Sequence, residues 1–242
     1  MSTAVKPNPA SEASKKQQVE EMFDSISHRY DFLNHFLSLG IDRGWRKKVR
    51  KLMAGFGHTR LLDVATGTAD LAIELAKIPG VNITGVDISR GMLAKGDEKL
   101  KTLGLNSRIV LQVADSEKLP YDDESFDGIT VAFGVRNFEN LEKGLSEMQR
   151  VLTVGGHLMI LEFSKPRNPV FSALYWFYFK TILPVAGRLF SKSSNAYTYL
   201  PQSVAAFPEG EKMVEILNNC GYRNVSFKPL TMGVCTLYIC EK

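Results

Sequence analysis

The feature that most constrains this chain is an apolar run that ends in a loop of small residues, with an acid at a set distance beyond it. The segment Leu61–Leu71 reads LLDVATGTADL, and a helical pattern follows its loop around Gly67. A second apolar run ends at Asp87, which lies 20 residues after Gly67. This layout is typical of a βαβ unit that binds a nucleoside, because small residues admit the ligand and the acid accepts its ribose hydroxyls.

The residues of the loop narrow the choice of ligand. A dinucleotide-binding loop needs G-x-G-x-x-G, so that pyrophosphate meets a helix N-terminus, but here the three positions are Ala65, Gly67 and Asp70. Asp70 would repel a phosphate, and together with Asp63 it favours a cationic ligand. S-adenosylmethionine carries a sulfonium and an ammonium group and no phosphate. The loop therefore predicts S-adenosylmethionine as the cofactor, and an ordinary strand-to-helix turn stays open as the alternative.

The composition argues against several other kinds of site. The net charge of +4 is mild and aromatic and basic residues do not interleave, so we expect no nucleic-acid partner. The three cysteines and four histidines lack the spacing of metal ligands, and we expect no metal. The thiols are expected to be reduced, in a cytoplasmic protein without a signal peptide. The polar residues 1–18 are expected to form a disordered tail.

The rest of the chain alternates strand and helix patterns, with helical patterns at Leu71–Lys77, Met92–Leu103, Leu141–Val151 and Met213–Cys220. Two closely spaced runs near the C-terminus are expected to pair antiparallel. The expected fold is α/β and Rossmann-like, a mostly parallel seven-stranded sheet with an antiparallel C-terminal hairpin, as in class I S-adenosylmethionine-dependent methyltransferases. The expected strands are Arg60–Val64, Asn82–Asp87, Ile109–Val113, Phe126–Phe133, His157–Phe163, Val225–Pro229 and Val234–Cys240.

Residues 19–242 are expected to form one domain with two additions to the sheet. Residues 19–58 carry helical patterns before the first strand and are expected to cap the sheet. Residues 168–200 form an aromatic insertion, whose uncharged stretch Asn168–Phe179 covers 12 residues. That is too short for a helix to cross about 30 Å of hydrocarbon. A buried lid, a wall of an apolar pocket and a membrane-surface contact all stay open for this insertion.

Several short blocks converge on one family. They are Met22–Asn34 (MFDSISHRYDFLN), Leu39–Arg46 (LGIDRGWR), Asp63–Asp70 (DVATGTAD), Phe133–Asn137 (FGVRN) and Leu161–Pro166 (LEFSKP). With these blocks the chain resembles the menaquinone/ubiquinone biosynthesis C-methyltransferase family from about residue 16 to residue 242. FGVRN and LEFSKP are the most specific blocks, and the long MFDSISHRYDFLN block favours the demethylmenaquinone branch.

The resemblance implies a C-methyltransferase that moves a methyl group from S-adenosylmethionine to a ring carbon of a prenylated demethylmenaquinol. The demethoxy-ubiquinol ring stays open as a second substrate, and the tail length is undetermined. The family's cofactor contacts match Thr68, Asp87, Asp115 and Ser116 of this chain. The loop reasoning adds Gly67 and Asp63 as cofactor-binding residues.

Four residues are predicted to serve the quinol. Arg136 and Asn137 follow the fourth expected strand, at the carboxyl end where α/β sheets bind ligands. Arg136 is a poor base because its pKa exceeds about 12, so we expect it to stabilise a phenolate or orient a water, while Asn137 orients the quinol. Tyr30 and Asp31 are expected to close over the site, with Asp31 or a water as proton acceptor. A surface ion pair for Arg136 and helix packing for Tyr30 and Asp31 are the alternatives.

Two other functions stay open. An O- or N-methyltransferase of a small soluble substrate would share the cofactor loop, although the aromatic run Tyr175–Phe179 favours an apolar substrate. A nonenzymatic module that retains S-adenosylmethionine is the second alternative. The expected partners are the prenylated quinol and the inner face of a membrane, contacted peripherally, and a homo-oligomer stays open.

Overall fold

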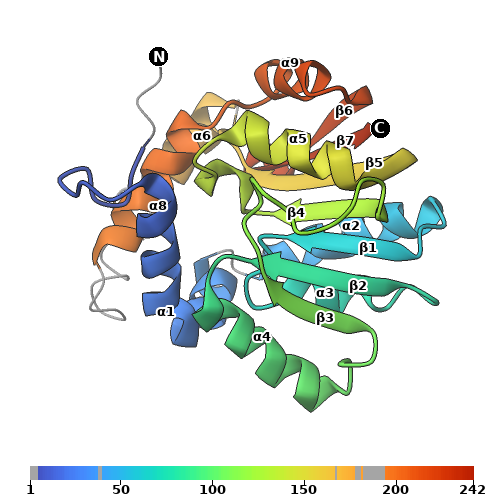
Figure 1. The fold of residues 1–242 in the computed structure, drawn as a ribbon. Helices are drawn as coiled ribbons and strands as arrows, with labels where there is room; N and C mark the ends of the chain where they lie inside the picture. The colour runs from blue at the N-terminus through green and yellow to red at the C-terminus, as the bar shows by residue number, and fades with distance from the viewer. Residues whose placement is uncertain (1–4, 38–39, 167, 178–180, 182–193) are drawn as a thin grey trace.

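The computed structural model describes residues 5–37, 40–166, 168–177, 181 and 194–242. Within these residues seven strands form one sheet in the order β3-β2-β1-β4-β5-β7-β6 (Figure 1). Strands β1 to β5 pair in parallel, and β7 pairs antiparallel with both β5 and β6. The strands are β1 (Arg60–Val64), β2 (Asn82–Asp87), β3 (Ile109–Val113), β4 (Phe126–Ala132), β5 (Leu152–Phe163), β6 (Arg223–Leu230) and β7 (Cys235–Glu241).

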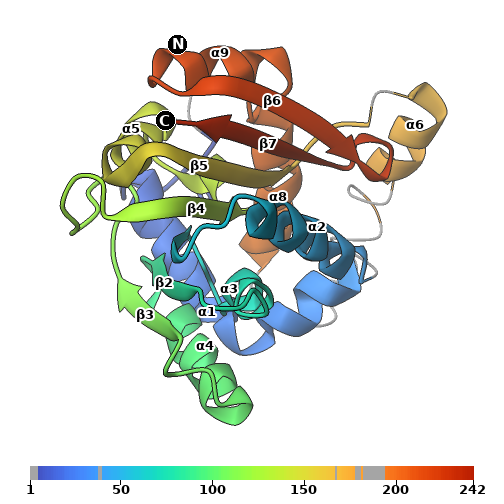
Figure 2. The same cartoon turned by 90° about the vertical axis from the view of Figure 1, so that its right-hand side faces the viewer.

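Helices cover both faces of the sheet and one of its ends. Figure 2 shows α2 and α3 on one face, and α5 lies on the other. Among the described helices, none is both long and apolar enough to cross a membrane. The helices are α1 (Lys15–Leu37), α2 (Ile41–Gly55), α3 (Asp70–Leu75), α4 (Arg90–Leu103), α5 (Leu141–Val151), α6 (Pro169–Phe177), α8 (Ser194–Ala206) and α9 (Glu211–Asn219), with the short 3-10 helices η1 (Val135–Asn137) and η3 (Thr231–Gly233).

The strands bury side chains on both faces, so their sequences read as apolar runs instead of alternating patterns. In β1, Leu62 packs into the core under α5 and α9, while its neighbour Leu61 packs into the core under α2 and α3. In β5, Ile160 and Leu161 divide in the same way between the two cores. The two cores hold the sheet rigid and present the ends of its parallel strands to the site.

The predicted fold class is confirmed, including the antiparallel hairpin. Several element boundaries differ from expectation by one or two residues, and two differ by more. Strand β5 begins at Leu152 because that residue already pairs with Phe126 of β4. Helix α1 begins at Lys15, inside the segment 1–18 that the sequence predicts to be disordered. The ammonium of Lys15 donates to the carbonyl oxygens of Arg136 at 2.9 Å and Phe138 at 2.7 Å, which ties the start of this helix to the sheet.

Helix α1 is anchored across the sheet end by a second contact, at the N-terminus of α4. The carboxylate of Asp24 accepts hydrogen bonds from the Ser89 hydroxyl at 2.5 Å and the Gly91 amide at 2.8 Å. Ser89 also caps α4, since its hydroxyl accepts from the amide of Met92 at 3.1 Å. A carboxylate is favoured at this position by the partial positive charge of a helix N-terminus. The anchor therefore sets the position of α1 over the ends of β1 and β2.

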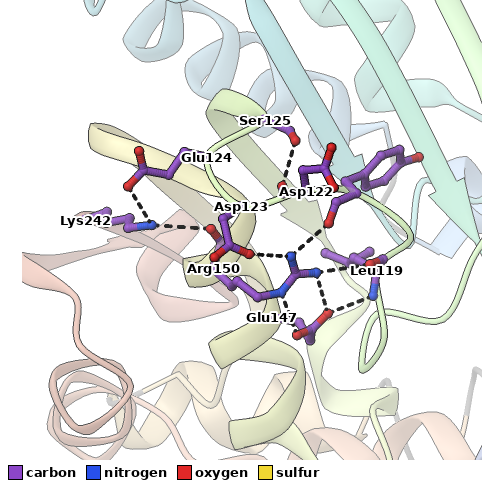
Figure 3. A network of polar contacts seen from close by, with 9 residues as sticks. Leu119, Asp122, Asp123, Glu124, Ser125, Glu147, Arg150 and Lys242 are labelled. Carbon is purple, nitrogen blue, oxygen red and sulfur yellow. Dashed lines mark hydrogen bonds and ion pairs between the residues drawn. The ribbon is translucent and has the colours of Figure 1, made fainter.

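Hydrogen bonds from Arg150, in the last turn of α5, hold the connection between β3 and β4 in place (Figure 3). Its guanidinium donates to the carbonyl oxygens of Tyr121 at 2.8 Å and Leu119 at 3.1 Å and pairs with Glu147. Glu147 in turn accepts from the amide of Leu119 at 2.9 Å. Lys242 joins this network by donating to the carbonyl of Arg150 at 3.3 Å. A planar guanidinium with five donors suits this task, because it bonds several carbonyls of one loop at once.

Candidate functional site

The site lies where the order of the strands reverses. The chain passes from β1 outward through β2 to β3, and then returns to β4 on the other side of β1. Ligands of open α/β sheets bind at the carboxyl ends of the strands at such a point. A hollow of about 690 Å³, including its open mouth, lies there in the structure. Its lining includes Lys16, Phe23, Ala65, Gly67, Asp87, Met92, Asp115, Ser116, Phe133, Gly134 and Asn137.

The backbone that forms the floor of the hollow adopts unusual conformations. Ala65 and Phe133, just after β1 and β4, have φ of +52° and +60°, a region that residues other than glycine seldom adopt. Such residues cost about 1–3 kcal/mol each and occur most often at ligand sites. The two turns also approach each other closely, since a Cβ on Gly134 would lie 2.5 Å from the Cβ of Ala65. Glycine at position 134 is therefore required by this close approach.

Asp87 and Gly67, which are both predicted to bind the cofactor, contact each other directly. One carboxylate oxygen of Asp87 accepts from the Gly67 amide at 2.8 Å, and the other accepts from the Ser89 amide at 2.9 Å. Burial raises the pKa of Asp87 to about 6, and the hydrogen bonds from Ser89 and Gly67 oppose that rise. The carboxylate lines the hollow in a fixed orientation. It can therefore accept hydrogen bonds from hydroxyl groups of a ligand without reorganising.

Asp115 and Ser116 also line the hollow, and Asp115 has a partner that the sequence does not predict. One of its oxygens accepts from the Glu117 amide at 2.9 Å. The other lies 2.6 Å from the ammonium of Lys16, in the first turn of α1. Glu117 is buried and accepts from the amide of Asn140 at 2.9 Å, which holds the turn against α5. The sequence does not reveal Lys16 as a residue of the site, because its segment reads as a polar tail.

Asp63 and Thr68 lie beside this hollow, facing a second one of about 350 Å³. Asp63 is 1% exposed, and its oxygens accept from the hydroxyls of Thr66 and Thr130, both at 2.6 Å. Burial raises the pKa of Asp63 to about 6, against the lowering effect of these two hydrogen bonds. The two hollows share the walls formed by Ala65 and Gly67. The predicted cofactor residues thus divide between two adjoining spaces.

Asn137 and Arg136 follow β4 on η1 but face different surroundings. Asn137 lines the larger hollow, and its Oδ1 is buried without a hydrogen-bond partner among the described residues. Arg136 turns into the protein, where its guanidinium lies 2.8 Å from the fully buried carboxylate of Glu162 and 5.5 Å from the ring centre of Phe163. Burial raises the pKa of Glu162, and the charge of Arg136 opposes that rise. Glu162 belongs to the LEFSKP block, and the sequence alone predicts no role for it.

Tyr30 and Asp31 belong to α1, the helix that lies over the hollow. The positions of their side chains lie outside what the structure describes. The structure therefore brings together Gly67, Asp87, Asp115, Ser116 and Asn137 around one hollow, with Asp63 and Thr68 on its neighbour.

The groups that line the two hollows suit a neutral nucleoside joined to a cationic amino-acid end. Asp87 presents fixed acceptors to hydroxyls, and Asp115 and Ser116 can meet the edge of a base. Asp63 and Asp70 supply negative charge on the adjoining hollow. In the described part of the chain, no group of three or more His, Cys, Asp or Glu residues is arranged to hold a metal ion. S-adenosylmethionine, with its sulfonium and ammonium groups, fits this set of residues.

Comparisons with known proteins find close relatives of this chain. Demethylmenaquinone methyltransferase of Bacteroides fragilis is 47% identical over 234 residues, which cover 96% of this chain and 96% of that protein. The ubiquinone/menaquinone biosynthesis C-methyltransferase UbiE of Geotalea daltonii is 48% identical over 230 residues, covering 94% of this chain and 97% of that protein.

Solved structures of low identity share the fold. A phosphoethanolamine N-methyltransferase of Haemonchus contortus, solved with S-adenosyl-L-methionine, superposes with a TM-score of 0.67 at 16% identity, over 97% of this chain and 61% of that one. A SAM-dependent methyltransferase of Aquifex aeolicus gives 0.57 at 21% identity, over 78% of this chain and 87% of that one. The sequence model of the ubiE/COQ5 methyltransferase family matches residues 11–242. The chain therefore belongs to the ubiE/COQ5 methyltransferase family.

Proposed function

We propose that this protein is a C-methyltransferase that moves the methyl group of S-adenosylmethionine to a ring carbon of a prenylated demethylmenaquinol. The observation that carries the proposal is identity of 47–48%, over nearly the whole chain, to enzymes named for that chemistry. The two names differ in whether they include ubiquinone, so the demethoxy-ubiquinol ring is the second candidate substrate. A soluble small-molecule O- or N-methyltransferase would share only the fold.

We assign the binding of the methyl donor, S-adenosylmethionine, to residues that line the two hollows. Asp87 accepts the ribose hydroxyls, and Asp115 with Ser116 meets the adenine. Gly67 lets the backbone come close, while Asp63 and Thr68 serve the adjoining hollow. Bound S-adenosylmethionine supplies an electrophilic methyl group on a positively charged sulfur. The acids of this site favour that positive charge by simple electrostatics.

The acceptor ring needs different help, because a neutral aromatic carbon is a weak nucleophile. Removing a proton from a quinol hydroxyl places charge on the ring, and the chain must orient the ring and stabilise that charge. We assign ring orientation to Asn137, whose buried Oδ1 lacks a partner among the described residues. We assign charge stabilisation to Arg136, whose Nη1 pairs with Glu162 but whose buried Nε lacks a hydrogen-bond partner among the described residues. We assign proton acceptance to Asp31 or a water beside Tyr30.

The substitution Arg136→Lys distinguishes a role of Arg136 in charge stabilisation from a role in cofactor binding. The variant is expected to bind S-adenosylmethionine normally and to transfer the methyl group at least 100-fold more slowly in single-turnover assays with a demethylmenaquinol, because an ammonium lacks the planar fork. Arg60→Lys, at the opposite end of β1 with a side chain 56% exposed, is the matched control. A normal transfer rate in Arg136→Lys would refute the role, and lost cofactor affinity would place Arg136 in the cofactor site.

The substrate itself is identified by mass spectrometry of quinones in cells that lack the protein. Accumulation of a demethylmenaquinone is expected, and an unchanged quinone profile would contradict the proposed function.

We further propose cytoplasmic location with peripheral contact at the inner membrane face, since a prenylated quinol resides in lipid. Phe177, which is 56% exposed on α6, belongs to the aromatic insertion assigned to this contact. Binding to anionic liposomes that salt reverses would support the contact, and failure to bind at low salt would refute it.

A further inference from the structure

Helix α2 carries cations on its exposed side that the proposed methyl transfer does not use. Trp45, Val49 and Met53 form its buried side and pack into the core under the sheet. Two of its basic residues, Arg46 and Arg50, pair with acids of the protein. The remaining basic residues of the helix are Arg43, Lys47, Lys48 and Lys51.

Three of these cations form a row along the surface of the helix. Arg43, Lys47 and Lys51 are exposed, and Lys48 beside them is partly buried. Side chains four residues apart lie one above the other on a helix, so the three exposed cations, called the basic row below, share one line. Like charges at this spacing destabilise a helix. The basic row therefore weakens α2 in the free protein, and an anionic partner would offset that repulsion.

The basic row lies on an open surface with apolar side chains at one end. Helix α2 forms the outer layer on its face of the sheet (Figure 2), and a Cβ on its exposed Gly44 would meet no described atom within 4 Å. Ile41, the first residue of α2, is 42% exposed, and Met232 of η3 is 71% exposed. The Nε1 of Trp45 donates to the hydroxyl of Thr231 at 2.9 Å, so η3 lies against the first turn of α2.

This combination of charge and apolar surface matches a lipid membrane better than other anions. The basic row extends over eight residues, or about 12 Å of helix, which is more than one small anion requires. It contains no aromatic side chain on which a nucleic-acid base could stack. Anionic headgroups above acyl chains offer charge to the basic row and an apolar layer to Ile41 and Met232.

We propose that the basic row of α2 binds anionic lipid headgroups, with Ile41 and Met232 contacting the lipid beside it. The inference rests on the proposed membrane contact and gives that contact a surface separate from the aromatic insertion. The first turn of α2 also lies close to the site, because the ring of Trp45 is 6.0 Å from that of Phe133, which lines both hollows. A membrane docked on the basic row is therefore near the site to which a lipid-held acceptor must pass.

The test measures co-sedimentation with phosphatidylcholine vesicles that contain or lack phosphatidylglycerol. The wild-type protein is expected to bind the vesicles that contain phosphatidylglycerol and to be released as the salt concentration rises. A triple variant, Arg43→Gln with Lys47→Gln and Lys51→Gln, is expected to bind them about 30-fold more weakly or worse, since each cation near an anionic surface contributes about a fivefold gain in affinity. Its methyl transfer to a demethylmenaquinol without a prenyl tail, in solution, is expected to stay at the wild-type rate.

Two matched variants separate the basic row from net charge. The first combines Lys143→Gln, Lys212→Gln and Arg223→Gln, which remove the same three charges from exposed positions on α5, α9 and β6. It is expected to bind the vesicles within threefold of wild type. The second exchanges Arg for Lys and Lys for Arg within the basic row, keeps the charge, and is expected to bind as wild type does.

Each contrary result has a distinct meaning. Equal weakening in the two Gln variants would overturn the inference, because binding would then follow net charge. Unchanged binding in the α2 variant would overturn it and leave the contact to the aromatic insertion. Binding of a duplex DNA oligonucleotide without binding of vesicles would assign the basic row to nucleic acid and overturn it as well. A wild type that binds no vesicle at low salt would overturn the inference together with the proposed membrane contact, whereas its methyl transfer to the tail-less acceptor tests the proposed reaction separately.

Discussion

Replacing Asp63 by Asn is expected to stabilise the ligand-free protein at neutral pH. Asp63 is 1% exposed, and burial raises its pKa from 3.8 to about 6 even though the hydroxyls of Thr130 and Thr66 donate to it. A carboxyl whose folded pKa exceeds its unfolded one loses stability when it ionises. The difference between 3.8 and about 6 corresponds to about 3 kcal/mol, because each tenfold change in acidity equals about 1.4 kcal/mol.

The amide keeps the shape of the carboxyl and both of its hydrogen bonds. A hydroxyl can donate or accept, so Thr66 or Thr130 can rotate to accept from the amide nitrogen. The stability that Asp63 contributes is complete below about pH 4 and is lost as the pH rises through about 6. Asn does not titrate, so its advantage over Asp is expected to grow from about 1 kcal/mol at about pH 4.5 to about 3 kcal/mol at about pH 7.5.

Urea unfolding followed by circular dichroism at the two pH values measures this difference. Asp97→Asn, which changes an exposed carboxyl on α4, is the control and is expected to stay within about 0.5 kcal/mol of wild type. An Asp63→Asn protein that is less stable than wild type at about pH 7.5 would refute the reasoning. Arg46 would then stabilise the Asp63 anion by more than burial destabilises it.

Two other predictions concern a residue that binds the cofactor and a residue that holds a loop of the site in place. Asp87→Ala should weaken S-adenosylmethionine binding at least tenfold by calorimetry, because two hydrogen bonds to a charged acceptor contribute about 1.5–3 kcal/mol each; unchanged affinity in a folded variant would remove Asp87 from the site. Arg150→Met should lower the free energy of unfolding by about 1–2 kcal/mol in urea and weaken the same binding, since the network of Figure 3 holds the loop that carries Asp115. A loss of stability with intact binding would show that this loop keeps its position without Arg150.

The sequence predicts the sheet and assigns Gly67 and Asp87 to one site because both inferences depend on local pattern. Apolar runs such as those at β1 and β2 mark strands buried on both faces, and a right-handed crossover then brings the loop and the acid together. The 20 residues between them hold α3, its two connections and strand β2, and the parallel pairing of β2 with β1 brings the end of that strand back to the loop.

The remaining features of the site depend on contacts between distant segments. Lys16 meets Asp115 across 99 positions, and Arg136 meets Glu162 across 26. No periodicity reports such pairs, so Lys16 reads as part of a tail and Arg136 is predicted to act on the quinol with no sign of its pairing with Glu162. The sequence also gives no sign of the positive φ at Phe133, because the surrounding packing imposes it and the position is not a glycine.

Because α1 forms part of the wall of the hollow, the stability of this helix should depend on whether a ligand is bound. Lys16 lines one side of the hollow from the first turn of α1. Lys15 ties that turn to the carbonyl oxygens of Arg136 and Phe138, and Asp24 is the other anchor of the helix. A ligand that binds only when this wall is in place lowers the population of molecules in which α1 has come away, by mass action. Hydrogen exchange at the amides of α1 should therefore slow as the hollow fills, although these amides lie more than 20 positions before the cofactor loop.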